Sequence, residues 1–325
     1  MWDEIALAGA GTYALAAMTY VFAMRGEVQY DSLKQYLRKG WPIFAPMNCL
    51  LYLVSQRRAR GAILDTEDFP ELAPLRDNWE TIREEALALH RAEHLEATSR
   101  PDSAAYYDIG FRTFYKYGWR KFYLNWYGRT QPSAERLCPK TVALLKELPT
   151  INGAMFSMLP PGGQLTRHSD PAACSLRYHL GLSTPNDDSC FINIDGRNYS
   201  WRDGDTLIFD ETHLHFARND ASSDRLILMC DVDRPVSWVG WPINAFYRWL
   251  MGATLVPNMA GDRRGMANRV FSGIAPQLQR AKTLKRTNRG TYRLLKYTVN
   301  GTLLLLVALT AWGLLQLFSG ALGLG

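Results

Sequence analysis

Three side chains able to hold a metal ion stand out in the sequence, two of them close together and one much later. Residues 165–170 read Leu-Thr-Arg-His-Ser-Asp, and His215 follows 45 residues after Asp170. We expect His168 and Asp170 on the turn after one strand and His215 on a later strand. Two imidazoles and one carboxylate on one side of a metal leave positions open for other ligands, an arrangement typical of non-haem iron. His213 shares a face with His215 if that strand is extended, and it is the alternative ligand.

Two arginines in apolar strands indicate that the same site binds an anion. Arg225 begins the run Arg-Leu-Ile-Leu-Met, and an arginine inside a barrel is costly unless it pairs with an anion. Arg177 and His179 share one face of the strand Ser-Leu-Arg-Tyr-His-Leu, and the apolar residues between them take the other. A guanidinium fits the distal carboxylate of a keto acid such as 2-oxoglutarate, and two cations on one face favour a dianionic ligand.

The part of the chain that holds these residues is predicted to be an antiparallel sandwich or barrel. From Gly153 onward, short apolar runs alternate with turn sequences such as Pro-Pro-Gly-Gly and Asp-Gly. Strands this short and evenly spaced are typical of a jelly roll, in which distant strands can bring the histidines together. The predicted strands are residues 154–159, 176–182, 190–194, 199–201, 206–209 and 226–232.

The regions on either side have a different composition. Residues 65–149 are predicted to be helical, because 77–97 and 140–148 are rich in helix-forming residues with helical spacing. Residues 233–262 are rich in Trp, Pro and Met. They are predicted to form either an amphipathic ledge on a membrane or a lid, and composition favours neither.

Three apolar segments predict contact with a membrane. Residues 5–24 contain no charged side chain and are long enough to span a hydrocarbon core of about 30 Å. The acidic residues before this run disfavour a cleaved signal peptide. Residues 302–324 form a second uncharged run, whereas residues 41–55 are shorter and interrupted by two prolines. The last segment is therefore predicted to be interfacial or re-entrant.

The charge distribution predicts how such a protein is oriented. The chain of 325 residues has a net charge of +6, and residues 263–296 contain ten Lys or Arg and no acidic residue. Positive loops stay in the cytoplasm, which predicts a multi-pass membrane protein with a cytoplasmic central domain and both termini outside. The basic run either sets this topology or binds anionic lipids, and its place beside a membrane helix disfavours nucleic acid. The five cysteines include no C-x-x-C pair, which disfavours disulfides and thiolate zinc.

Residues 168–233 resemble the aspartyl/asparaginyl β-hydroxylase family. The resemblance rests on Ser-Leu-Arg-Tyr-His-Leu-Gly-Leu (175–182), Trp-Arg-Asp-Gly-Asp-Thr-Leu-Ile-Phe-Asp-Glu-Thr (201–212), His215 and Asp-Arg-Leu-Ile-Leu (224–228). The N-terminal apolar run and the motifs Phe-Pro-Glu-Leu (69–72), Asn-Trp-Glu (78–80) and Arg-Glu-Glu-Ala-Leu (83–87) resemble the membrane-bound lipid A hydroxylase branch.

The resemblance implies a role for each residue of the site. His168 and His215 would bind Fe(II). The peptide hydroxylases of the family have glycine where this chain has Asp170, so Asp170 is either a third ligand or a turn residue that accepts a hydrogen bond from an imidazole. The residues implied to bind 2-oxoglutarate are Arg225, for its C5 carboxylate, and Arg177, His179 and Ser157.

The activity implied is that of an Fe(II)/2-oxoglutarate-dependent dioxygenase, with dioxygen as the oxidant and ascorbate as a stimulant. It would hydroxylate the carbon next to the carbonyl of a secondary acyl chain of lipid A, at the cytoplasmic face of a bacterial inner membrane, with the catalytic domain in the cytoplasm. The expected partners are this or a related lipid and anionic membrane lipids, with no nucleic acid, and no protein partner is inferred. The alternatives are a peptide aspartyl/asparaginyl β-hydroxylase, a non-catalytic jelly-roll binding protein, and a zinc hydrolase, which would leave Arg225 unexplained.

The sequence thus predicts a membrane-anchored α+β fold, with a double-stranded β-helix (jelly roll) core, flanking helices and transmembrane helices at both ends. The predicted parts are a transmembrane helix (1–25), a basic linker with the interfacial segment 41–55 (26–64), the oxygenase domain (65–235, helical over 65–149 and jelly roll over 150–235), an aromatic and then basic membrane-proximal region (236–300), and a second transmembrane helix (301–325).

Overall fold

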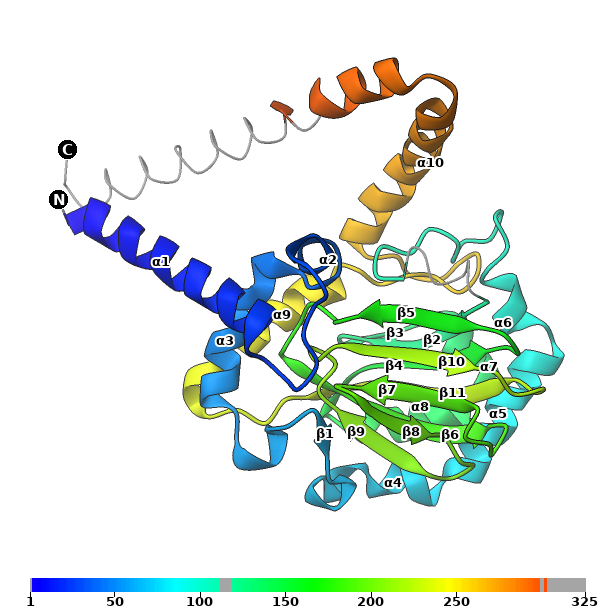
Figure 1. Ribbon diagram of the computed structural model, residues 1–325. Helices are drawn as coiled ribbons and strands as arrows, with labels where there is room; N and C mark the ends of the chain where they lie inside the picture. The colour runs from blue at the N-terminus through cyan, green and yellow to red at the C-terminus, as the bar shows by residue number, and fades with distance from the viewer. Residues whose placement is uncertain (1, 112–117, 299–300, 303–325) are drawn as a thin grey trace. The chain divides into compact units, whose positions relative to one another are not determined.

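The computed structural model describes residues 2–111, 118–298 and 301–302. The chain divides into two compact units, one ending at Arg269 and the other beginning at Val270. Every strand of the described residues belongs to the first unit (Figure 1).

Two antiparallel sheets form the centre of the first unit. The large sheet has seven strands in the order β1-β9-β6-β11-β4-β2-β3, and the small sheet has four in the order β5-β10-β7-β8. From β4 to β11 the chain passes between the sheets in the strand order of a jelly roll. The strands are Ile63–Leu64 (β1), Arg120–Trp126 (β2), Arg129–Thr130 (β3), Ile151–Leu159 (β4), Gln164–His168 (β5), Ser175–Ser183 (β6), Cys190–Ile194 (β7), Arg197–Ser200 (β8), Thr206–Phe209 (β9), His215–Asn219 (β10) and Arg225–Asp233 (β11).

The two sheets differ in burial, and their sequences differ accordingly. The central strands β4, β6 and β11 of the large sheet are buried at nearly every position. Strands covered on both faces read as near-continuous apolar runs, which is how β4 and β11 appear in the sequence. In the small sheet, β7 alternates between buried and partly exposed residues, as expected for a strand with one covered face.

Helices cover the outer face of the large sheet. Side chains of α5 and α8 pack with Leu176, Tyr178 and Leu180 of β6 in one apolar core. The helices are Trp2–Ala23 (α1), Leu33–Lys39 (α2), Ala45–Val54 (α3), Ala73–Asp77 (α4), Trp79–Arg91 (α5), His94–Ala97 (α6), Pro132–Leu137 (α7), Pro139–Lys146 (α8), Trp241–Gly252 (α9) and Met266–Thr287 (α10), with short 3-10 turns at Pro42–Phe44, Arg57–Ala59, Thr66–Asp68, Pro70–Leu72 and Trp238–Gly240.

A second group of helices, α1, α3 and α9, lies at one end of the sheets (Figure 1). Ala17 and Val21 of α1 pack with Cys49 of α3. Leu51 of α3 and Tyr247 of α9 share a small core with the segment that follows β5. This end of the molecule therefore supports the loop after β5, which contains Asp170, one of the predicted metal ligands.

The prediction of a membrane-anchored, multi-pass fold is wrong for the part of the chain that the structure describes. No helix among these residues is both long enough and apolar enough to cross a membrane. Residues 5–24 do lie in the helix α1, apart from Met24, but much of this run is Gly, Ala, Thr and Tyr. A run without charge is not necessarily apolar enough to enter hydrocarbon. The predicted inner-membrane location and cytoplasmic orientation depended on these spans and lose that basis.

Other predicted segments have different outcomes. Residues 303–325, which include nearly all of the second predicted span, lie outside the described residues. Residues 41–55 fold as the 3-10 turn Pro42–Phe44 and the helix α3. The remaining domain limits stay predictions, and the boundary between the compact units falls at residue 269.

The strand predictions were largely correct but incomplete. All six predicted strands coincide with β4, β6, β7, β8, β9 and β11. The helical assignment of 65–149 missed β2, an aromatic strand that joins the large sheet beside β4. The segments containing β5 and β10 are short and rich in polar residues, so neither gave a clear apolar run.

Candidate active site

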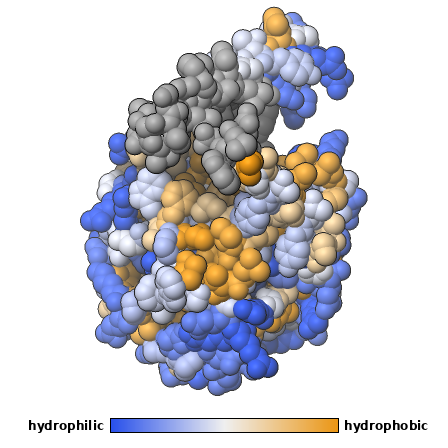
Figure 2. Space-filling view, turned by 90° about the vertical axis from the view of Figure 1, so that its left-hand side faces the viewer, coloured by the Kyte–Doolittle hydropathy of each residue, from blue (hydrophilic) through white to orange (hydrophobic). Residues whose placement is uncertain are grey.

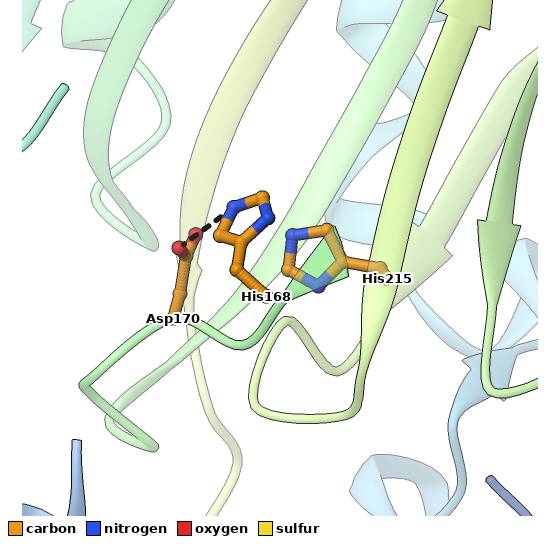
Figure 3. Close-up of side chains that lie close together, drawn as sticks. All are labelled: His168, Asp170 and His215. Atoms are coloured by element: carbon orange, nitrogen blue, oxygen red, sulfur yellow. Dashed lines mark ion pairs between the residues drawn. The ribbon is translucent and has the colours of Figure 1, made fainter. Parts of the chain in front are cut away.

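The three predicted metal ligands come together where β5 and β10 pair. His168 ends β5 and His215 begins β10, and the two residues lie opposite one another in the antiparallel register. Their ring centroids are 4.4 Å apart. His168 Nε2 lies 3.5 Å from an oxygen of Asp170, and ligand atoms of all three residues lie within 4.8 Å of one another (Figure 3). This spacing allows all three side chains to bind one metal ion.

Backbone carbonyls fix the orientation of both imidazoles. His168 Nδ1 donates to the carbonyl of Thr166 at 2.7 Å, and His215 Nδ1 donates to the carbonyl of His213 at 2.9 Å. Each ring therefore keeps the lone pair of Nε2 for a metal. Burial lowers the pKa of His168 and lowers that of His215 to about 3. Both rings are thus neutral at physiological pH, as metal ligands must be.

The alternative ligand, His213, lies elsewhere. Its Nδ1 is 3.3 Å from a carboxylate oxygen of Asp195, in the turn that connects β7 and β8. Strand β10 begins only at His215, so the alternation that would place both histidines on one face does not extend back to His213. His213 is therefore separate from the group of His168, Asp170 and His215.

Arg177 lies next to this group, but carboxylates surround it. Its Nη2 is 3.1 Å from Asp170 and contacts Glu211, and its Nε is 3.0 Å from Asp231. Burial alone would lower the pKa of Arg177, but these carboxylates raise it, so the guanidinium stays charged. Arg177 and His179 do share the predicted face, yet Arg177 is not a second free cation, because its charge is already matched.

Burial and the charge of Arg177 together set the protonation of the neighbouring acids Glu211 and Asp170. Burial raises the pKa of Glu211 well above its ordinary value, even though Arg177 opposes this effect. For Asp170 the balance is reversed: burial would raise its pKa, but the charges of Arg177 and the two histidines lower it. Asp170 is therefore held as a carboxylate that can bind a cation, while burial favours the protonated form of Glu211.

Arg225 is the opposite case. It is only 2% exposed, and its Nε and Nη2 have no hydrogen-bond partner among the described residues. The guanidinium lies over the ring of Trp201, 4.5 Å from the ring centroid. Burial lowers its pKa to about 10, which still leaves it charged at neutral pH. A buried, charged and unsatisfied guanidinium indicates a binding site for an anion.

Two further donors lie in the pocket of Arg225. Trp201 donates to His179 Nδ1 at 3.3 Å, which leaves the proton of this neutral ring on Nε2, an atom with no partner among the described residues. Trp119 donates to the hydroxyl of Ser157 at 2.7 Å, so the hydroxyl proton can point to another acceptor. These groups and Arg225 would satisfy the oxygens of a carboxylate.

One pocket contains all seven predicted residues. Sequence reasoning missed several others that line it or support it. Asp231 could have been noticed, because a carboxylate in the apolar run of β11 requires a buried cation. Trp119, Trp201 and Phe209 gave no such signal. The pocket is lined by Phe111, Trp119, Ser157, Leu165, His168, Asp170, Arg177, His179, Ile192, Trp201, Phe209, His215, Ala217, Arg225 and Met229.

Comparison with known proteins supports the family resemblance. Residues 76–235, just under half of the chain, match the family model described as Aspartyl/Asparaginyl beta-hydroxylase. The matched range includes the jelly roll and all the residues described above. The resemblance recognised in the sequence is thereby confirmed at the level of the family.

Individual relatives differ in what they act on. An "Ornithine lipid ester-linked acyl 2-hydroxylase" of Rhizobium tropici is 30% identical over 186 residues, which cover 56% of this chain and 65% of that protein. The human "Aspartyl/asparaginyl beta-hydroxylase" is 33% identical over 166 residues, covering 50% of this chain and 21% of that protein. A crystal structure of a Pseudomonas putida prolyl-4-hydroxylase gives a TM-score of 0.33 at 16% identity, covering 48% of this chain and 87% of that one, a similarity too weak to argue from.

Proposed function

We propose that this protein is an Fe(II)/2-oxoglutarate-dependent dioxygenase that hydroxylates an acyl chain of a lipid. The observation that carries the proposal is the unpaired guanidinium of Arg225 in the same pocket as His168, Asp170 and His215. A metal site alone would fit many reactions. A metal site with a buried anion site a short distance away fits a cosubstrate that is both a chelating keto acid and a carboxylate.

The donor set fits iron. Two neutral imidazole nitrogens and one carboxylate suit Fe(II), and they leave positions open for a keto acid and dioxygen. When bound, the iron would supply the oxidation of an unactivated C–H bond, with 2-oxoglutarate decarboxylated to succinate. Asp170 is oriented for this role by Arg177, which lies 3.1 Å away.

The protein's own residues would bind and orient the cosubstrate. Arg225, His179 and Ser157 offer donors to its distal carboxylate. Apolar and aromatic side chains make up much of the rest of the lining, including Ile192, Phe209 and Met229. Such a lining keeps water away from the site, which strengthens each of these polar contacts.

An acyl chain is proposed as the substrate because of the relative that hydroxylates one. The name of that relative specifies position 2 of an ester-linked acyl chain, which is the carbon next to the carbonyl. We extend this reaction to the present chain, with a secondary acyl chain of lipid A as the first candidate and an ornithine lipid as the second. The alternative is hydroxylation of aspartyl or asparaginyl residues in a peptide, as the name of the human relative indicates.

Succinate formation tests the activity and the substrate together. The purified protein would be incubated with Fe(II), ascorbate and 2-oxoglutarate, and supplied separately with lipid A, an ornithine lipid, or an Asp/Asn peptide. We expect succinate and a product with one added oxygen only with a lipid. Strong turnover with the peptide would replace this proposal with the alternative, and no turnover with any of them would reject it.

The two neighbouring histidines provide a matched pair of variants. We expect His215→Ala to abolish turnover and the binding of Fe(II), because one of two imidazole ligands is lost. His213→Ala should retain iron binding and at most weaken turnover, since it removes only the contact with Asp195. Metal content after dialysis and succinate formation measure both effects, and equal losses would contradict the ligand assignment.

A further inference from the structure

The helix α9 lacks the polar outer face that a surface helix normally has. Its inner side contributes Tyr247 and Met251 to an apolar core. Its outward positions Trp241, Pro242, Ala245, Phe246 and Trp249 are all exposed, and none is polar or charged. Arg248, whose side chain is 42% exposed and pairs with Asp233, lies beside these positions and adds one charge to the helix. An exposed helix face this apolar is typically covered by a partner.

The neighbouring elements extend this surface. The 3-10 turn Trp238–Gly240 precedes α9, and Trp238 is 73% exposed. Helix α3 packs beside it, since Ser237 donates to the carbonyl of Val54 and both helices share one core. On α3 the outward residues Leu50 and Leu53 are again apolar. Figure 2 views the side of the molecule where α3 and α9 lie in Figure 1, and apolar residues gather in the middle of that face.

The segments that form this surface contain no acidic residue, and the adjacent Asp233 is paired with Arg248 of α9 at 3.0 Å. Neither residues 33–60 nor residues 234–261 contain an Asp or Glu. Arg57 and Arg60 follow α3 directly and are exposed. If two copies of the chain paired through this face, their positive edges would come close together, whereas an anionic lipid surface would neutralise them. Exposed tryptophans with basic neighbours are also characteristic of a helix that lies in a membrane interface.

The surface is joined to the metal-binding loop through one buried residue. Asn48 of α3 donates to the carbonyl of Pro171 at 3.0 Å and accepts from the backbone of Ala173 at 3.0 Å. Tyr247 of α9 donates to the same Asn48 side chain at 2.6 Å. Pro171 follows Asp170 in the chain, so the helices that form the apolar face also hold the loop that bears Asp170.

We infer that the outward faces of α3, the turn Trp238–Gly240 and α9 are a docking surface for an anionic lipid bilayer. Docking by this surface would present lipids to the side of the molecule where the loop after β5 lies. The inference deepens the proposed function by naming the physical form of the substrate, a lipid within a bilayer. Docking itself can be measured without any turnover.

Vesicle flotation with the full chain tests the proposal. The probes are phosphatidylcholine vesicles with and without phosphatidylglycerol. We expect the wild-type protein to float with the anionic vesicles. The triple substitution Trp241→Ser, Phe246→Ser and Trp249→Ser should lower the partition coefficient about tenfold or more, because it removes most of the apolar area that would enter the lipid. The matched control is Ile63→Ser, which changes an exposed apolar residue of β1 and should have no effect.

A second pair of variants separates charge from apolar contact. Arg57→Gln with Arg60→Gln should reduce binding to the vesicles that contain phosphatidylglycerol severalfold and leave binding to pure phosphatidylcholine unchanged. Lys140→Gln, at an exposed position of α8, is the control and should change neither. Equal partition of the wild type and the triple variant would overturn the proposal.

Two measurements keep the proposal testable if the triple variant folds poorly. Brominated phospholipids in the anionic vesicles should quench the tryptophan fluorescence of the wild-type protein, and a lack of quenching would refute docking. If the wild type ignores vesicles but the triple substitution converts a dimer into a monomer in sedimentation, the occupant is a second copy and the inference is wrong. Hydroxylation of detergent-dispersed lipid tests the proposed function separately from docking, because the triple variant should retain this activity.

Discussion

Arg177 and Arg225 lie in one pocket and are equally hidden from solvent, yet their surroundings differ completely. Arg177 contacts Asp170, Glu211 and Asp231. Arg225 has an aromatic ring and no acid, and two of its three nitrogens have no partner among the described residues. A buried charge must be compensated. The protein compensates the first arginine itself and leaves the second for a ligand, so only the second indicates what the site binds.

Arg177→Met should have the largest effect on stability. The substitution leaves Asp170, Glu211 and Asp231 buried without their cation, and breaking a buried pair in this way costs about 3–5 kcal/mol. Chemical denaturation of the metal-free protein measures the change. Arg218→Met is the control, because its partner Asp220 is half exposed and such pairs contribute about 0–1 kcal/mol. A loss as small as the control's would mean that Arg177 is not needed to balance these acids.

Arg225→Met should separate binding from stability. We expect the 2-oxoglutarate KM to rise by the equivalent of about 2–5 kcal/mol, because a charged partner of the carboxylate is lost. The free energy of unfolding without ligand should stay the same or increase, since the substitution removes an unpaired buried charge. Steady-state succinate formation and denaturant titration measure the two quantities. An unchanged KM together with a large loss of stability would make Arg225 a structural residue like Arg177.

Glu211→Gln should have the smallest effect and should depend on pH. Because burial raises the pKa of Glu211 well above 4.5, the folded protein keeps a proton that the unfolded chain releases above that pH. The contribution of Glu211 to stability is thus complete below pH 4.5 and is lost as the pH rises through the folded pKa, at no more than about 1.4 kcal/mol per pH unit. Glutamine mimics the protonated acid and should flatten this decline. Chemical denaturation of the metal-free wild type and variant over a pH series measures this difference. If the free energies of unfolding of the two proteins change with pH in parallel, Glu211 is ionised in the folded protein.

The sequence by itself was enough to predict the strands whose apolar residues are buried. It was also enough to predict that the site binds a metal ion and an anion. The short apolar runs of β4 and β11, and the alternation of apolar residues in β6, indicated strands. The pattern of His168, Asp170 and His215 indicated a metal, and Arg225 an anion. Such inferences succeed because a buried position requires an apolar side chain, and a metal or anion site requires particular ligand groups. Both requirements are visible in the residue type itself.

The sequence was misleading where a local pattern admits more than one environment. Residues 5–24 are uncharged, but α1 is not apolar enough for a membrane span. His213 matched the spacing of His215, but the strand begins after it. In the first case the deciding property is the overall hydropathy of the helix, and in the second it is the residue at which the strand begins. Neither property follows from the local pattern of residue types.

Only the tertiary structure decided which arginine is matched and which is not. Arg177 and Arg225 look alike in sequence, since each lies in an apolar strand. The acidic side chains that surround Arg177 come from the loop after β5, from the turn before β10 and from β11, segments that are distant in the chain. Electrostatic compensation depends on distance in space, and folding alone brings these three acids within reach of one guanidinium while leaving the other for a ligand.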